Sequence, residues 1–268
     1  MEPIAQGLGI ATTASSELYP DVELSEEERE AALAQARAKK AWRIEEEQKA
    51  EQRRLFEQEV RRPWNAVELA RFVVGRMPAD YGHPFTVDDS NRAVVNALCD
   101  YFTGNPRFES SGPDRSLSKG ICLLGSVGTG KTTLMRAFSR NKRQCFNVIP
   151  CRRVAAMFAA DGHDVIEAFS QLHHEAFGDP RVFYQRQIGY CFDDLGTEEE
   201  KKHYGNGVNV MADLILACYD RPEVPFHCRH ITTYLTADEV ESNYGARVRS
   251  RLREMFNMIQ LGGEDRRK

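Results

Sequence analysis

A glycine-rich loop near the middle of the chain places the strongest constraint on its fold. Residues 125–132 read Gly-Ser-Val-Gly-Thr-Gly-Lys-Thr, which satisfies the pattern GxxxxGK[ST]. The apolar run before it, residues 120–124, is typical of a buried parallel strand, and residues 132–140 predict a helix. Glycines let backbone amides close around phosphate oxygens, and a helix N-terminus favours an anion. Because this pattern arises by chance in only on the order of 1% of chains of this length, we predict a phosphate-binding loop.

The fixed positions of the loop predict ATP and Mg²⁺ as cofactors. Lys131 supplies positive charge to the β- and γ-phosphates and is a predicted catalytic residue. The hydroxyl of Thr132 is placed to ligate Mg²⁺. The predicted nucleotide contacts from this part of the chain are Gly125, Ser126, Val127, Gly128, Thr129, Gly130, Lys131, Thr132 and Thr133.

A second apolar run in the sequence is followed by two acidic residues. The apolar run 188–192 ends in Asp193 and Asp194, and the carboxyl ends of parallel strands are where α/β proteins bind their ligands. We assign Asp193 to the Mg²⁺ shell and Asp194 to orienting and deprotonating the attacking water. Glu198 is a weaker candidate for the base. The alternative for the paired acids is a simple helix cap.

A third element is a run of arginines, Arg247, Arg249, Arg251 and Arg253, at every second position. A guanidinium offered to the γ-phosphate of a neighbouring subunit stabilises charge in the transition state. Binding to a nucleic-acid backbone and plain surface charge are the alternatives.

The distribution of apolar runs predicts an α/β fold with a parallel sheet. Runs at 145–149, 188–192 and 230–235 predict three more strands. Helical sequence follows the first of them as far as Phe177, and residues 208–219 predict another helix. Strands that alternate with helices indicate a parallel sheet flanked by helices.

A long charged helix is predicted from Ser25 to about Arg62. Ser25 and Glu28 match a capping box, and Pro63 ends the segment. Leu33, Ile44 and Leu55 recur every eleven residues, about three helical turns, and therefore share a face, whereas Trp42 and Phe56 lie off that line. Such a segment either binds a partner or is merely a solvated extension.

Composition excludes several other classes of protein. No stretch approaches the roughly 18 uninterrupted apolar residues of a membrane span, and residues 1–24 lack the basic start and apolar core of a secretory signal, so we expect a disordered lead-in. The seven cysteines, an odd number, favour reduced thiols and a cytoplasmic location. A metal cluster at residues 227–230 is disfavoured against a structural Cys228. The net charge of −4 carries no global nucleic-acid signature.

Taken together, the motifs resemble a known family. The segments GSVGTGKTTL, CFDDLGTE and TTYLTADEVESNYGARVRSRLREMFNMIQLGGEDRR are similar to those of bacterial replicative helicase loaders of the DnaC type. Transposon helper ATPases of the IstB type share these features more distantly. The resemblance runs from about Phe85 to the last residue.

The resemblance implies roles for individual residues. Lys131 and Thr132 match the Walker A residues, and Asp193 and Asp194 match the Walker B pair. Arg251 matches the arginine finger, with Arg247 as its neighbour, and Arg267 matches the sensor 2 arginine that contacts nucleotide.

The resemblance also exposes one departure. The sensor 1 motif of the family usually reads Thr-Thr-Asn-Leu, whereas residues 232–235 read Thr-Thr-Tyr-Leu. Either Tyr234 or Thr233 is then expected to take the sensor role.

The fold implied is a P-loop NTPase of the AAA+ type with a reduced or absent lid, preceded by the long helix. The expected domains are a helical partner-binding region at 25–80 and the ATPase domain at 81–268. The implied function is ATP-dependent helicase loading in DNA replication, with the N-terminal helix gripping a hexameric helicase through Trp42, Ile44, Leu55 and Phe56, and with single-stranded DNA as a further ligand. ATP hydrolysis is expected to be weak until subunits assemble and Arg251 completes a neighbour's site. The alternative is an IstB-type helper that polymerises on duplex DNA and recruits a transposase.

Overall fold

The computed structural model describes residues 23, 25–81, 86–179, 182–198, 201–203 and 206–266. They divide into two units, with the boundary between Glu59 and Val60. The predicted lead-in at 1–24 lies outside the described residues, apart from Glu23. The domain boundary expected after residue 80 stays a prediction.

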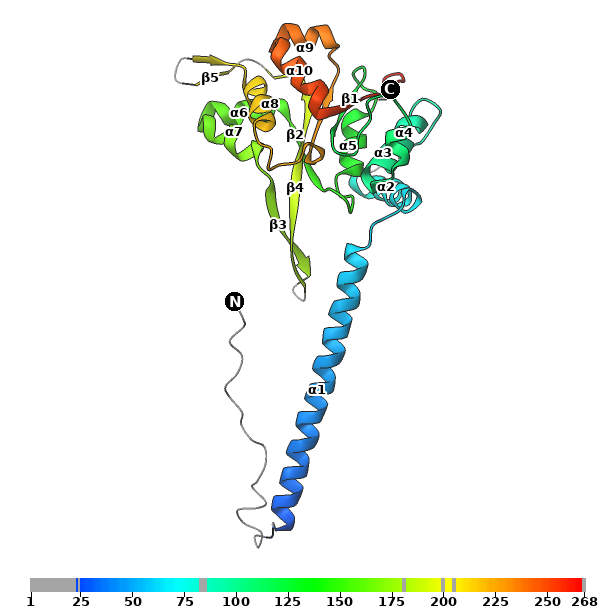
Figure 1. Ribbon diagram of the computed structural model, residues 1–268, viewed down its shortest axis with the longest axis vertical. Coiled ribbons are helices and arrows are strands. Elements are labelled where there is room, and N and C mark those ends of the chain that lie inside the picture. The colour runs from blue at the N-terminus through cyan, green and yellow to red at the C-terminus, as the bar shows by residue number, and fades with distance from the viewer. Residues whose placement is uncertain are drawn as a thin grey trace, which may run out of the picture. The chain divides into compact units, whose positions relative to one another are not determined.

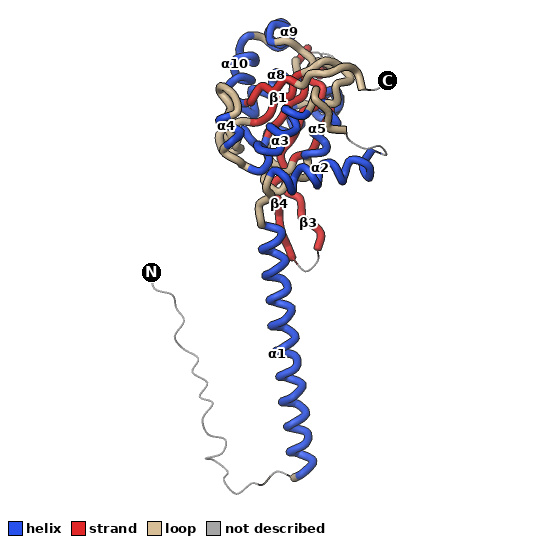
Figure 2. Tube along the Cα trace, turned by 90° about the vertical axis from the view of Figure 1, so that its right-hand side faces the viewer, coloured by secondary structure: helices blue, strands red, loops and turns tan. Residues whose placement is uncertain are grey.

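The first unit is formed by helix α1 (Glu26–Arg61), whose last two residues belong to the second. The predicted capping box is present, because the Glu28 amide donates to Ser25 Oγ over 3.3 Å and Glu28 Oε2 accepts the Ser25 amide over 2.8 Å. Figure 2 shows α1 as one continuous helix. Its sequence is rich in Ala, Glu, Lys and Arg, residues with high helix propensity.

The second unit is built on a parallel sheet, and the predicted α/β class is confirmed (Figure 1). Five strands run parallel in the order β2-β4-β7-β1-β8. Their bounds are β1 (Gly120–Leu124), β2 (Phe146–Pro150), β4 (Val182–Leu195), β7 (Arg229–Thr233) and β8 (Phe256–Gln260). The order places β7 between the strand that precedes the glycine-rich loop and the strand that ends in the two acids.

Helices cover both faces of the sheet, each over its own buried apolar cluster. One cluster joins the sheet to α2 (Ala66–Tyr81), α3 (Arg92–Thr103) and α5 (Lys131–Phe138). The other joins it to α6 (Cys151–Asp161), α7 (His163–Ser170), α8 (Val210–Tyr219), α9 (Ala237–Tyr244) and α10 (Ala246–Met255). The shorter elements are α4 (Arg107–Ser110), η1 (Phe226–Cys228), β5 (Lys201–His203) and β6 (Asn206–Val208).

One predicted element is wrong. Helical sequence was expected as far as Phe177, but α7 ends at Ser170 and β3 (His173–Asp179) pairs antiparallel with the first half of β4. The two strands follow each other directly and pair as a hairpin as far as Asp179 and Val182, so the turn residues Gly178 and Asp179 were a local signal that the helical prediction missed.

Two further observations concern the segment after β8 and the apolar length of the helices. After β8, residues 261–266 contain no helix, so no lid follows the sheet within the described part of the chain. None of the helices described is long and apolar enough to cross a membrane.

Candidate nucleotide-binding site

The glycine-rich loop joins β1 to α5 at the carboxyl edge of the sheet. Gly128 and Gly130 adopt φ angles of 84° and 95°, left-handed conformations that glycine adopts without steric cost. Lys131 is buried in the loop, and its Nζ donates to the carbonyl oxygens of Gly125 and Ser126 over 2.8 and 2.9 Å. The ammonium is thus already held inside the ring of backbone groups that the motif predicts will surround phosphate.

The C-terminal segment passes against the same loop. The Arg266 amide donates to the Gly128 carbonyl over 3.0 Å, and the Leu261 amide donates to the Leu124 carbonyl over 2.7 Å. A Cβ placed on Gly128 would lie 2.0 Å from Oδ1 of Asp265. The left-handed backbone angle calls for glycine at 128, and a Cβ there would also make the exposed Asp265 side chain turn aside.

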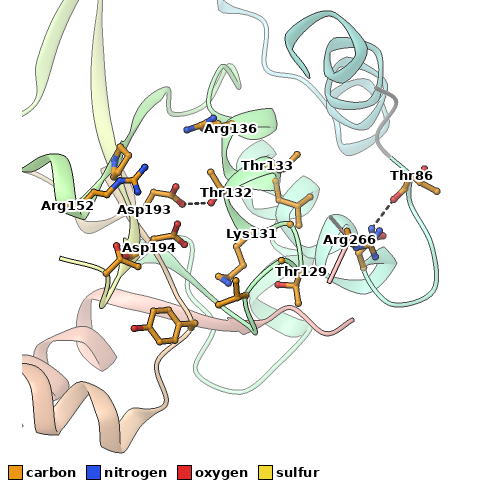
Figure 3. A pocket seen from close by; sticks show the side chains of 18 residues that line it. Thr86, Thr129, Lys131, Thr132, Thr133, Arg136, Arg152, Asp193, Asp194 and Arg266 are labelled. Carbon is orange, nitrogen blue, oxygen red and sulfur yellow. Dashed lines mark hydrogen bonds between the residues drawn. The ribbon is translucent and has the colours of Figure 1, made fainter. Parts of the chain in front are cut away.

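Asp193 stands at the centre of a hydrogen-bond cluster. Its Oδ1 accepts from the Thr132 hydroxyl over 2.9 Å, a contact drawn in Figure 3, and from the Thr232 hydroxyl over 2.7 Å. Burial raises the pKa of the Asp193 carboxyl, the charge of Asp194 raises it further, and the two hydroxyls and the charge of Arg136 oppose the shift. The loop threonine and the strand aspartate, predicted to share the metal, lie in direct contact.

These two groups fit the metal that the motif predicts. A hydroxyl and a carboxylate are hard oxygen ligands of the kind that Mg²⁺ prefers, usually together with substrate phosphates and water. The raised pKa indicates that burial outweighs the two hydroxyls and the positive charge of Arg136, which favour the ionised carboxylate.

A bulge brings the second acid to the pocket. In a regular strand, adjacent side chains point to opposite faces, but the pairing of β4 with β7 shifts register between Phe192 and Leu195. Asp194 has a φ of 56°, and its amide donates to Thr232 Oγ1 over 2.8 Å. As a result, both Asp193 and Asp194 line the same pocket (Figure 3).

The pocket has a volume of about 800 Å³. Val127 and the loop residues from Gly128 to Thr133 line it, together with both aspartates and Tyr234. Of the predicted nucleotide contacts, Gly125 and Ser126 do not line it and instead hold Lys131 through their carbonyls.

Several further residues that line the pocket were not predicted from the sequence, among them two arginines and two residues from the segment before α3. Arg136 follows Thr132 by one helical turn on α5, and Arg152 is the second residue of α6, directly after β2. Their spacing from the loop helix and from a strand end was the signal that could have revealed them. Thr86 and Asn91 come from the segment before α3, far from any motif.

Arg266 lines the pocket, one position before the predicted sensor residue. Its guanidinium lies 2.8 Å from Asp88 and 2.6 Å from Ser90 Oγ. Arg267 itself lies outside the described residues.

The two sensor 1 candidates differ in position. The Thr233 hydroxyl donates to the Leu195 carbonyl over 2.8 Å, away from the pocket, while Tyr234 lines the pocket and donates to the Gly196 carbonyl over 2.9 Å. Glu198, the weaker base candidate, does not line the pocket and accepts from the Tyr244 hydroxyl and the Gly196 amide.

Arg251 does not lie in the pocket of its own chain. On α10 its guanidinium lies 3.9 Å from the centre of the Tyr219 ring and donates to Glu254 over 3.2 Å. Arg247 lies one turn earlier, exposed. The predicted role of Arg251 in a neighbour's site stays a prediction.

Comparisons with known proteins add structural similarities only. No protein-family model matches the chain, and no curated protein matches it. The chain is similar to a crystal structure of the DnaC helicase loader, with a TM-score of 0.43 and 15% identity, over 66% of this chain and 93% of that one. It is similar to a crystal structure of DnaI with a TM-score of 0.40 and 16% identity, over 68% of this chain and 90% of that one. Similarity at this level does not assign a function to the chain.

Proposed function

We propose that this protein is an ATPase whose site is the pocket at the carboxyl edge of the sheet. The observation that carries the proposal is the contact between Thr132 of the loop and Asp193 of β4, with Lys131 and Asp194 beside them. A loop that cradles phosphate, a hydroxyl and carboxylate for a metal, and a second carboxylate are the parts that phosphoryl transfer to water requires.

In this mechanism each residue has one task. The amides of residues 127–131 and the Lys131 ammonium bind the β- and γ-phosphates. Thr132 and Asp193 hold Mg²⁺, which neutralises charge that develops on the phosphate oxygens. Asp194 orients a water and accepts its proton, and Thr232 keeps Asp193 in place through its hydrogen bond.

The site is completed between subunits in this proposal. Arg251 lies outside its own pocket, so a finger role requires a second copy that presents it to the γ-phosphate. Hydrolysis by the isolated chain is therefore slow and increases on assembly. A guanidinium supplied in this way contributes about 10³–10⁵ in rate in well-studied phosphoryl-transfer enzymes.

The ATPase serves as an assembly factor that loads a hexameric replicative helicase on single-stranded DNA. Support comes from the DnaC-type motifs around the pocket and from the exposed apolar residues of α1, of which Trp42 is the most exposed at 65%. The Phe56 side chain, also predicted as an anchor, lies outside the described residues.

Nucleotide titration tests the ATPase. Lys131→Ala is expected to abolish binding of ATP measured by calorimetry, because it removes the one ammonium inside the loop. Lys39→Ala, an exposed lysine on α1, is the matched control and should bind ATP as the unaltered chain does. Normal ATP binding by Lys131→Ala would overturn the proposal.

A binding experiment separates the loader from the transposition helper. The unaltered chain is expected to retain a hexameric replicative helicase in a pull-down, whereas Trp42→Ala weakens retention and Gln52→Ala, exposed on the same helix, does not. Retention of a transposase and duplex DNA in place of the helicase would favour the helper.

A further inference from the structure

Helix α1 carries a narrow stripe of exposed apolar side chains. Leu33, Ile44 and Leu55 are 51%, 43% and 54% exposed. Their spacing of eleven residues equals about three turns, so the stripe runs almost straight along an unbent helix. The three residues span 22 positions, or about 33 Å of helix. Single exposed apolar residues are common on protein surfaces, so the alignment gains meaning only from the charges that lie between the three side chains.

The charges inside the stripe are separated along the helix. Arg37 and Lys40 lie between Leu33 and Ile44, on the same face, and neither forms an ion pair within the described residues. Glu47 and Glu51 lie on the corresponding face after Ile44. Between Leu33 and Leu55 the face is therefore basic before Ile44 and acidic after it. The exposed ion pairs of Glu47 with Arg43 (3.9 Å) and of Glu51 with Arg54 (2.8 Å) must yield to a partner helix.

This pattern is self-complementary when reversed about Ile44. Leu33 lies eleven positions before Ile44 and Leu55 eleven after it, while Arg37 and Glu51 lie seven before and seven after. In an antiparallel pair centred on Ile44, apolar layers therefore alternate with layers in which Arg37 faces Glu51. We propose that α1 pairs antiparallel with α1 of a second copy of this chain through this face, a property that goes beyond the proposed ATPase and loader function.

A parallel pair is disfavoured by the same charges. In register, it would place Lys40 against Lys40 and Glu51 against Glu51, and like charges at facing positions are destabilising. Antiparallel pairing removes both conflicts. It also places Lys40 of one copy beside Glu47 of the other.

The pairing leaves another face of the helix open. Trp42 lies nine residues after Leu33, about 180° around the helix from the stripe. The same helix can thus pair with its own copy on one face and present Trp42 on the other, whereas Ile44 and Leu55, also expected as helicase anchors, would be shared between the two contacts.

Cysteine cross-linking of the full chain tests the arrangement. All seven native cysteines are buried, so the background is low. Ile44→Cys is expected to form a disulfide-linked dimer under mild oxidant without nucleotide. Leu33→Cys and Leu55→Cys should cross-link to each other when mixed and not to themselves, and Trp42→Cys is the matched exposed control that should remain monomeric. Self-cross-linking of Leu33→Cys would establish a parallel pair. Equal dimer yields for Ile44→Cys and Trp42→Cys would show that α1 does not pair through this face.

A charge exchange gives an independent readout by sedimentation, where the 30.5 kDa chain should form a species of twice that mass. Arg37→Glu is expected to weaken association by about tenfold. Adding Glu51→Arg should restore it, because the exchanged pair again faces its opposite charge. If the double variant is weaker than Arg37→Glu alone, Arg37 does not face Glu51 and the antiparallel register is wrong.

Discussion

Thr232 Oγ1 donates a hydrogen bond to Asp193 Oδ1 over 2.7 Å, and the same oxygen accepts the amide of Asp194 over 2.8 Å. One hydroxyl on β7 thus connects Asp193, the proposed metal ligand, with the backbone of Asp194, the proposed base, on the neighbouring strand. Thr232 is fully buried, so its geometry is held by the sheet and not by solvent. The contact explains how a left-handed residue is held at the end of β4.

This contact predicts that Thr232 positions the acids. Thr232→Val keeps the shape of the side chain and removes the hydroxyl, and we expect a loss in kcat of roughly 10- to 100-fold, as for other residues that orient metal ligands. Thr232→Ser should recover most of the activity, because it restores the hydroxyl. ATP affinity should change little in either variant. A loss of affinity with unchanged kcat in Thr232→Val would show that the residue acts on binding instead.

The pKa of Asp193 predicts a conflict between stability and activity. The folded protein raises this pKa, so the stabilising state is the protonated one, which is lost as pH rises through the raised value. Asp193→Asn removes the buried charge and can still accept from both threonine hydroxyls. We expect the variant to unfold at higher urea concentration at neutral pH, with a difference that disappears below the ordinary Asp pKa of about 3.9.

The check is urea unfolding from about pH 3 to pH 8 without nucleotide or Mg²⁺. With Mg²⁺ and ATP the order should reverse, since the unaltered carboxylate then binds the metal and gains stability from it. A variant that is less stable at every pH would mean that the charge of Asp193 is already compensated in the folded chain.

Gly128 links the loop to the C-terminal segment. Gly128→Ala would force a Cβ against the Asp265 carboxylate and strain a left-handed backbone, a cost of roughly 1–3 kcal/mol. We expect weaker ATP binding and a lower Tm. Gly75→Ala is the matched control, because nothing lies within 4 Å of its Cβ position in α2. A helix-interior glycine replaced by alanine should stabilise by about 0.5–1 kcal/mol. Equal effects at the two positions would contradict the packing argument.

Arg251 is predicted to act on a neighbouring subunit. Arg251→Ala should leave ATP binding unchanged and remove the assembly-stimulated part of hydrolysis. The rate of hydrolysis in the assembled state should fall by about 10³-fold or more. Arg247→Ala, one turn earlier on α10, is the comparison. Mixing Arg251→Ala with Lys131→Ala subunits should restore some hydrolysis, because each supplies what the other lacks. Full stimulated activity in Arg251→Ala would show that another residue is the finger.

Local sequence determined the loop, the pair of acids and the alternation of strands and helices. These features depend on residues close together in the chain: glycines at positions that need a left-handed backbone, and an apolar run that ends in Asp193 and Asp194. The predicted α/β fold class is therefore confirmed by the structure. The capping box at Ser25 was found for the same reason, since both of its residues lie within one helical turn.

Only the tertiary structure decided what depends on distant parts of the chain. Asp194 turns toward the pocket because a bulge shifts the register between β4 and β7, two strands that are far apart in the chain. Arg136, Arg152 and Arg266 reach the same pocket from three separate elements. Such juxtapositions arise from the packing of the sheet and its helices, and the local positions of Arg136 and Arg152 after the loop and after a strand end only hint at them. The glycine-rich loop was enough to predict a phosphate site, whereas the fold determines which other residues lie around that loop.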